Sequence, residues 1–275
     1  MSSEEKFAFV QSLAADLNRG EVALPSFPDV VMRIRKALDD PDCNSESLAA
    51  IVGTDPVLAS RILMYANSSY YNAAGVKIAS LNAAIGRIGF ERLRTTAITY
   101  AVEQLHTSKD LDAMRGELQV TWKESLRTAA MAQALAESNE DLDAEAAFVA
   151  GLLSRVGSLY VFTKHGQFPD LIGDEEARAD LIADWEGPIG ESIVANWDFP
   201  EEIVATFNPD SDCQQNRHVA ILTDAIVCAR RSLGESSVIL ESSLELSRLK
   251  IEENQFDSVI ENYKIKLDTL TSALA

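Results

Sequence analysis

Few residues of this 275-residue sequence stand in a pattern that could catalyse a reaction. The sequence contains three histidines, at His106, His165 and His218. They lie far apart, and no HExxH segment places two imidazoles one helical turn apart to bind a metal ion. The three cysteines form no CxxC pair, and the GxSxG, Walker and GxGxxG motifs are absent. The sequence therefore indicates no nucleophilic or phosphate-cradling site and no histidine-rich metal site.

One polar and aromatic stretch, YANSSYYN at residues 65–72, could instead recognise a partner. The first reading is structural: Asn67 and Ser68 satisfy carbonyls at a helix end while the tyrosines wedge between helices. The second reading is an exposed recognition surface, in which aromatic and amide groups contact another protein. The residues of this candidate surface are Asn67, Ser68, Tyr70, Tyr71 and Arg94.

The charge distribution argues against nucleic acid as a partner. The net charge is −19, and residues 111–275 hold 13 basic and 30 acidic residues. Affinity for a phosphate backbone comes largely from Lys and Arg, so we expect no nucleic-acid binding. Arg87, Arg92 and Arg94 lie close together in the less acidic part, where a solvated helix face is the simpler interpretation.

Apolar residues recur at three- and four-residue intervals almost throughout, which predicts an all-α fold. Asp55 can cap a helix that begins at Pro56 and buries Leu58, Ile62 and Ala66. Gly89 should separate two further helices. Residues 143–165 read as one strongly apolar, central helix. No uninterrupted apolar run in the sequence approaches the roughly 20 residues that span a bilayer. With no signal-peptide pattern at the N-terminus, we expect a cytoplasmic protein.

Several stretches together resemble the HDOD family over about residues 20–230. They are LPSFPDVVMRI, DPVLASRILMYANSSYY, LNAAIGRIGFERLR, the stretch from Trp122 to Ala130, AGLLSRVG and WDFPEEI. The family comprises bacterial signalling relatives of HD-type metal phosphohydrolases. The resemblance implies an irregular multi-helix, HD-like fold in two lobes. We expect an N-terminal lobe at residues 1–110, an HD-like lobe at 111–230, and a C-terminal helical extension at 231–275 that packs on the second lobe.

The resemblance also implies where a hydrolase would bind its metal, and this sequence departs from that pattern. The vestigial-site positions are Glu124, Ser154, Arg155, Asp210 and Asp224. The adjacent His and Asp of the hydrolase pattern fall at Ser154 and Arg155. One hypothesis is that Arg155 replaces the metal charge and pairs with the acidic residues; the alternative is that Arg155 points to solvent.

The resemblance and the lost ligands together predict a non-enzymatic signal-transduction module that binds a regulatory protein and needs no cofactor. Two alternatives remain open. The vestigial pocket could hold a nucleotide-type small ligand as a sensor, or the protein could retain residual metal-dependent phosphodiesterase activity.

Overall fold

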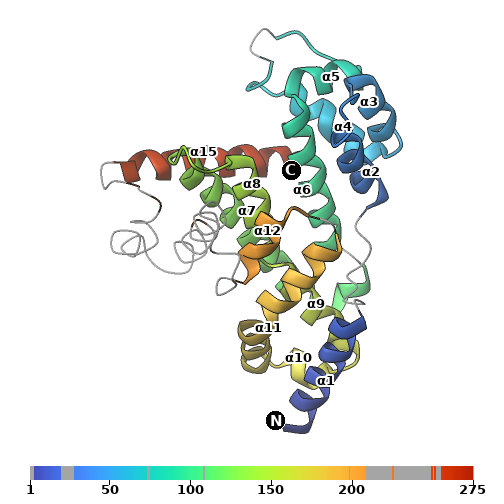
Figure 1. Ribbon diagram of the computed structural model, residues 1–275, viewed down its shortest axis with the longest axis vertical. Coiled ribbons are helices and arrows are strands. Elements are labelled where there is room, and N and C mark those ends of the chain that lie inside the picture. Colours follow the sequence, from blue (N-terminus) through green and yellow to red (C-terminus); the bar gives the residue numbers. More distant parts are fainter. Residues whose placement is uncertain are drawn as a thin grey trace. The chain divides into compact units, whose positions relative to one another are not determined.

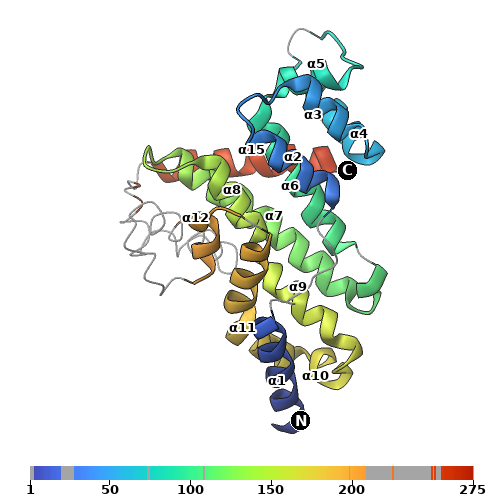
Figure 2. The same ribbon diagram turned by 45° about the vertical axis from the view of Figure 1, so that its right-hand side comes forward.

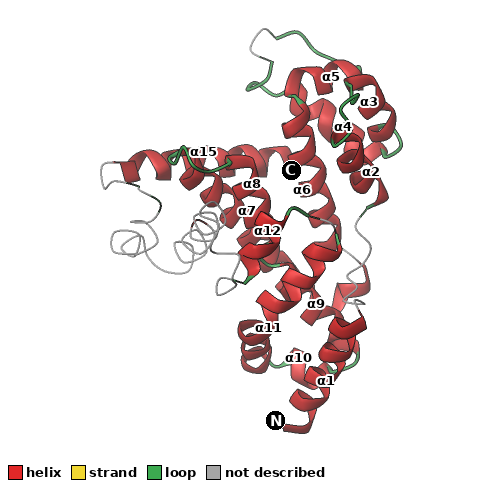
Figure 3. Ribbon diagram, in the orientation of Figure 1, coloured by secondary structure: helices red, strands yellow, loops and turns green. Residues whose placement is uncertain are grey.

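The computed structural model describes residues 3–19, 28–72, 75–107, 109–197, 199–208 and 255–274, with the single residues 225, 249 and 251. Every regular element in these ranges is a helix, which confirms the predicted all-α class (Figure 3). The chain divides into two compact units. Unit 1 comprises Met1–Pro25 and Leu105–Leu267, and unit 2 comprises Ser26–Gln104 and Asp268–Ala275. The expected division at residue 110 differs from this one, since the first helix belongs to unit 1.

Unit 1 is built from α-helices and short 3₁₀ turns (Figures 1 and 2). The α-helices are α1 (Ser3–Arg19), α7 (Arg115–Glu137), α8 (Ala144–Leu153), α9 (Val156–Thr163), α10 (Pro169–Gly173), α11 (Glu175–Asn196), α12 (Glu201–Val204) and most of α15 (Phe256–Leu274). The 3₁₀ turns are η1 (Lys109–Met114), η2 (Lys164–Gly166) and η3 (Ala205–Phe207).

Helix pairs that pack at very short range form the core of unit 1. α8 lies on α7, and α9 lies on α11. A Cβ added to Gly151 of α8 would lie 2.7 Å from the Cα of Ala129 in α7. A Cβ added to Gly157 of α9 would lie 2.1 Å from the carbonyl oxygen of Glu186 in α11. Only glycine lets these helix backbones approach so closely, so both positions depend on the missing side chain.

The N-terminal helix α1 is tied to unit 1 by polar and aromatic contacts. The carboxylate of Asp16 accepts hydrogen bonds from Lys164 Nζ at 2.6 Å and Tyr160 Oη at 2.5 Å. The ring of Phe9 meets that of Phe168 edge-on at 5.8 Å. These contacts explain why residues 1–25 group with unit 1 rather than with the helices that follow them in sequence.

The apolar segment predicted as one helix is two helices, α8 and α9, so that prediction was wrong at its centre. The segment Ala144–Gly166 has the length and composition of a membrane span, but 83% of its apolar window is buried inside the protein. Its unbroken hydropathy therefore reflects the core of unit 1, where helices are surrounded by other helices and need no polar face.

Unit 2 contains α2 (Asp29–Leu38), α3 (Ser45–Val52), α4 (Pro56–Ala66), α5 (Leu81–Ile88), nearly all of α6 (Phe90–His106), and the end of α15 from Asp268. The predicted start of α4 is confirmed: Asp55 Oδ1 accepts from the backbone N–H groups of Val57 and Leu58, both at 3.0 Å. The predicted stripe of Leu58, Ile62 and Ala66 is fully buried. Gly89 separates α5 from α6 with φ +83°, as the sequence predicts.

The first prediction concerns the glycine at the α9–α11 contact. G157A should lower the free energy of unfolding by about 1–3 kcal/mol, because its methyl group must push the α11 backbone away. G116A in α7 is the matched control, since nothing lies within 4 Å of its added Cβ. G116A should leave the free energy of unfolding unchanged or raise it by about 0.5 kcal/mol. Urea unfolding of both full-length variants measures the difference, and equal stabilities would contradict the proposed close contact.

A second prediction concerns Tyr100, which lies in the core of unit 2 and donates a 2.8 Å hydrogen bond to Asp55 Oδ2. Burial of the phenol and the hydrogen bond to Asp55 raise the pKa of Tyr100 to about 12. The folded state then holds its proton above pH 10 while the unfolded state loses it, so Tyr100 makes stability fall as pH rises from 10 to 12. Tyrosinate absorbance of the wild type should include a late-titrating component that is smaller by one group in Y100F. A wild-type titration with every tyrosine near pH 10 would refute the assignment.

Candidate functional site

The break between α8 and α9 determines where Arg155 lies. The chain leaves α8 at Ser154, whose hydroxyl donates a 2.7 Å hydrogen bond to the carbonyl of Gly151. Arg155 follows with φ −108° and ψ 10°, and α9 begins at the next residue. Because Gly151 and Gly157 on either side are locked against α7 and α11, the Arg155 side chain starts from a well-supported backbone.

The guanidinium of Arg155 bridges carboxylates from two different helices. Its Nη2 lies 2.9 Å from Oε2 of Glu124 in α7. Its Nη1 lies 3.3 Å from both carboxylate oxygens of Glu186 in α11. The Glu186 side chain is only 7% exposed, that of Arg155 is 25% exposed, and that of Glu124 is 42% exposed. Arg155 therefore offsets a buried negative charge, and its contact with Glu124 lies closer to solvent.

Two small residues of α9 complete this arrangement. Ser158 donates a short hydrogen bond through its hydroxyl to Oε1 of the same Glu186 carboxylate. Gly157 allows α9 to touch the backbone of Glu186 itself. The buried carboxylate thus receives a charged donor and a neutral donor from neighbouring positions in the chain, as a carboxylate taken out of water requires.

The side chains around Arg155 do not fit a divalent metal ion. Such an ion needs about six ligands, mostly imidazoles, carboxylates and water. Among the residues that the structure describes, no three His, Cys, Asp or Glu side chains are gathered for this purpose. The Arg155 guanidinium stays protonated, and at 4 Å it would repel each unit of metal charge by about 4 kcal/mol in a partly polar surrounding. The arrangement is chemically an ion-pair network.

The structure brings together some of the predicted vestigial-site residues. Arg155 and Glu124 pair directly, and the alternative in which Arg155 points to solvent does not fit the geometry. Ser154 directs its hydroxyl to Gly151 instead. Asp210 and Asp224 lie outside the described residues. Glu186 was not predicted, since its only signal in the sequence is a carboxylate within the apolar stretch WEGPIG.

The candidate recognition residues of unit 2 differ in their contacts: some hold the loop after α4, and one is exposed. Asn67 ties the end of α4 to the following loop: its Nδ2 donates to the carbonyl of Ile78 at 2.7 Å, and its Oδ1 accepts from the Ile78 N–H at 2.8 Å. Tyr71 accepts a 3.0 Å hydrogen bond from Arg92 Nε. Tyr70 is 75% exposed. Asn67 and Tyr71 therefore hold the loop, while Tyr70 is displayed.

The three neighbouring arginines do not form one solvated face. Arg87 donates through Nη1 to the carbonyls of Ala66 at 3.2 Å and Val76 at 3.1 Å, which satisfies the end of α4. Arg92 donates to Tyr71, and Arg94 forms a long ion pair with Glu91, at 3.8 Å. Guanidinium groups here support the loop after α4, a role that spacing in the sequence did not reveal.

The helical architecture is HD-like, and the Arg155 ion-pair network lies among α7, α9 and α11. A model of the HDOD domain matches residues 24–212, and the chain belongs to the HDOD family. A Treponema pallidum protein of uncharacterised function is 24% identical over 196 residues, which are 66% of this chain and 36% of that protein. The chain thus spans little more than a third of the length of this curated relative.

Solved structures share the fold. A Shewanella amazonensis protein, provisionally named a metal-dependent phosphohydrolase, is 26% identical with a TM-score of 0.74, covering 97% of this chain and 99% of that one. An HDOD domain protein of unknown function from Geobacter sulfurreducens is 22% identical with a TM-score of 0.65, covering 90% and 93%. A Marinobacter aquaeolei protein, provisionally named a signal transduction protein, is 23% identical with a TM-score of 0.64, covering 92% and 60%.

A third prediction tests the ion-pair network. R155M should lower the free energy of unfolding by about 2–4 kcal/mol, because the Glu186 charge stays buried without this cation. E124Q should cost less than about 1 kcal/mol, because that contact lies near solvent. Denaturant unfolding of the full chain measures both values.

The double variant R155M/E186Q is the control for this mechanism. Its loss in the free energy of unfolding should be smaller than the sum of the losses in R155M and E186Q. In the double variant no carboxylate charge is left buried without its cation. Strictly additive losses, or an R155M variant as stable as the wild type, would contradict the role of Arg155.

Proposed function

We propose that this protein is a non-enzymatic signal-transduction module that acts by binding a regulatory protein. The observation that carries the proposal is the Arg155 guanidinium between Glu124 and Glu186. In the hydrolase pattern this part of the chain supplies metal ligands, and the metal in turn makes water acidic enough to attack phosphate. A permanent cation at this position cannot bind or activate a metal-bound water, whereas it preserves the packing that surrounds it.

The family relationship supports a signalling role. HDOD domains share the fold of proteins provisionally named phosphohydrolases and signal transduction proteins. Fold alone does not assign chemistry, so the choice between these roles rests on the residues of the site. Here those residues favour a scaffold that has kept its hydrolase-like shape and lost its hydrolytic groups.

A fourth prediction separates this proposal from residual phosphodiesterase activity. Purified full-length protein should contain substoichiometric manganese, iron and magnesium by elemental mass spectrometry. It should not hydrolyse bis(p-nitrophenyl) phosphate or cyclic dinucleotides above the rate of the R155M variant. Manganese should not raise its melting temperature, whereas an ion at a hundred times its Kd for a native site would add about 2.7 kcal/mol of stability.

Stoichiometric metal together with turnover that a chelator abolishes would contradict the proposal. Binding of a cyclic dinucleotide without turnover, seen as a melting shift that R155M removes, would favour a nucleotide sensor instead. Cross-linking of the full chain in its native cells, followed by identification of the linked proteins, tests the positive half of the proposal.

A further inference from the structure

A hollow of about 320 Å³ in unit 2 is lined by the end of α4, the turn that follows it and the last part of α15. Residues from Asp268 onward belong to unit 2, so the whole lining comes from one unit. The volume is at the lower end of the roughly 300–1,000 Å³ of small-molecule sites, which leaves room for one long side chain. We call it the Tyr70 hollow, after the more exposed of its two aromatic residues.

Aromatic rings form part of the wall of the Tyr70 hollow. Tyr65 and Tyr70 both line it, and each packs against Tyr71, with 5.2 Å and 4.8 Å between ring centroids. Tyr71 is held in turn by the 3.0 Å hydrogen bond from Arg92 Nε. Tyr70 is therefore supported from one side although it is 75% exposed. The face of a tyrosine ring attracts a cation through the ring quadrupole.

Asp268 supplies a negative charge to the same hollow. The carboxylate of Asp268 has no hydrogen-bond or ion-pair partner among the described residues, and the 3.1 Å hydrogen bond from Thr271 Oγ1 goes to its backbone carbonyl. Within the described part of the chain, no Lys, Arg or His side chain lines this hollow. The carboxylate can therefore accept hydrogen bonds from a cation that enters from outside.

Met64 gives the hollow an apolar surface beside the charge. Its side chain is 53% exposed, and its flexible thioether can adapt to the methylene groups of a ligand. Long basic side chains carry an apolar stem below a charged head, and they commonly lay that stem along an apolar surface. The lining thus offers a contact to each part of such a side chain.

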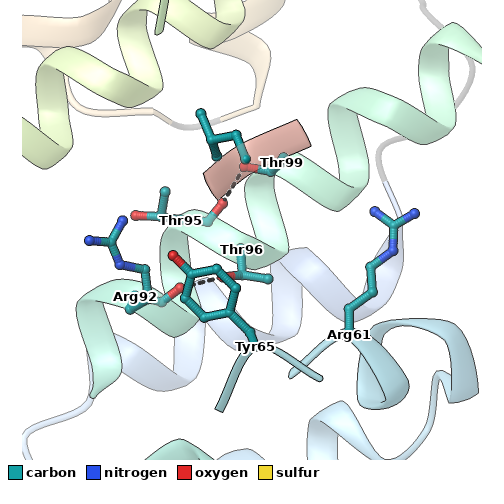
Figure 4. Close-up of a pocket in the computed structure, with 7 residues that line it drawn as sticks. Arg61, Tyr65, Arg92, Thr95, Thr96 and Thr99 are labelled. Atoms are coloured by element: carbon teal, nitrogen blue, oxygen red, sulfur yellow. Dashed lines mark hydrogen bonds between the residues drawn. The ribbon is translucent and has the colours of Figure 1, made fainter. Parts of the chain in front are cut away.

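The arginines near Tyr65 line a different and smaller hollow, of about 40 Å³. Figure 4 shows Arg61 and Arg92 on opposite sides of the Tyr65 ring. Arg61 forms an ion pair with Glu103, and Arg92 donates to Tyr71. Three threonines of α6 share this lining, and their hydroxyls donate to carbonyls one turn earlier in the helix (Figure 4). Two guanidinium groups already line the smaller hollow, so a further cation is favoured only in the Tyr70 hollow.

We propose that the Tyr70 hollow binds a basic side chain of a partner protein, arginine in preference to lysine. The cation lies against the Tyr70 ring and the Asp268 carboxylate, and its methylene stem lies on Met64. Arginine suits this lining best, because its planar guanidinium stacks on aromatic rings and pairs with a carboxylate through two N–H groups. This inference rests on the proposed protein-binding function and names the surface and the partner's chemistry.

Charge complementarity selects a basic partner at two levels. Within the hollow, Asp268 is the one charged residue among the described lining residues. Over the whole chain, the net charge of −19 attracts positively charged partners and disfavours acidic ones. The local and the overall charge therefore favour the same kind of occupant.

A phage-displayed library of random peptides, selected on the full-length protein, tests the proposal. The enriched peptides should share an Arg or Lys. A representative peptide, synthesised and labelled, is then measured by fluorescence anisotropy. Replacing its Arg by citrulline, which is neutral and has nearly the same shape, should weaken binding at least about fivefold. D268N should have a similar effect on the unmodified peptide, because the same charged contact is lost.

Matched variants separate this site from general electrostatics and from simple apolar contact. D42N makes the same charge change on an exposed aspartate of unit 2, outside the hollow, and should alter affinity less than about twofold. Y70F keeps the aromatic face and should bind like the wild type. Y70L keeps apolar area without that face and should weaken binding at least about threefold. Tyr70 is exposed, so melting curves of both variants should match that of the wild type.

Enriched peptides without a basic residue, equal effects of D268N and D42N, equal effects of Y70L and Y70F, or no enrichment at all would overturn the proposal. So would self-association of the wild type in sedimentation that D268N and Y70L abolish, because the occupant would then be a second copy of this chain. None of these results bears on metal content or hydrolysis. The proposed function can therefore survive with a different docking surface, or fail while this hollow still binds peptides.

Discussion

The burial of the Glu186 carboxylate is the constraint on which the arrangement of unit 1 depends. A charge that is 7% exposed needs compensation from within the protein, and Arg155 and Ser158 of the same short segment provide it. Gly157 lies between them and lets α9 approach the backbone of Glu186. The break between α8 and α9 gives Arg155 its position. One ion pair thus links the interruption of an apolar segment to a close helix contact.

The two units differ in how their helices pack and in their charge. The helices of unit 1 keep an HD-like architecture because their packing depends on glycine contacts and apolar burial, which need no metal. Unit 2 has 8 basic and 9 acidic residues and is nearly neutral, whereas the remainder of the chain carries almost all the negative charge.

Local signals in the sequence predicted the helical fold well, and non-local contacts explain what they missed. The Asp55 cap, the buried stripe of α4 and the stop at Gly89 each depend on neighbours within a turn, so spacing reveals them. The break at Ser154 and Arg155 depends on packing against other helices, and the apolar pattern runs through it unchanged. Glu186 lies 31 residues beyond Arg155, and no local rule connects the two. The pairing of Arg155 with Glu124 was predicted because the family pattern places both residues near one site, where opposite charges attract.

Anomalous diffraction from crystals soaked in manganese would test the central claim most directly, because it locates the ion and the Arg155 side chain in one experiment. We expect no anomalous peak between Glu124 and Glu186, with the guanidinium remaining between the two carboxylates. A strong peak coordinated by these carboxylates, with Arg155 displaced, would show that the site accepts a metal and would contradict the role of Arg155 as the permanent cation between them.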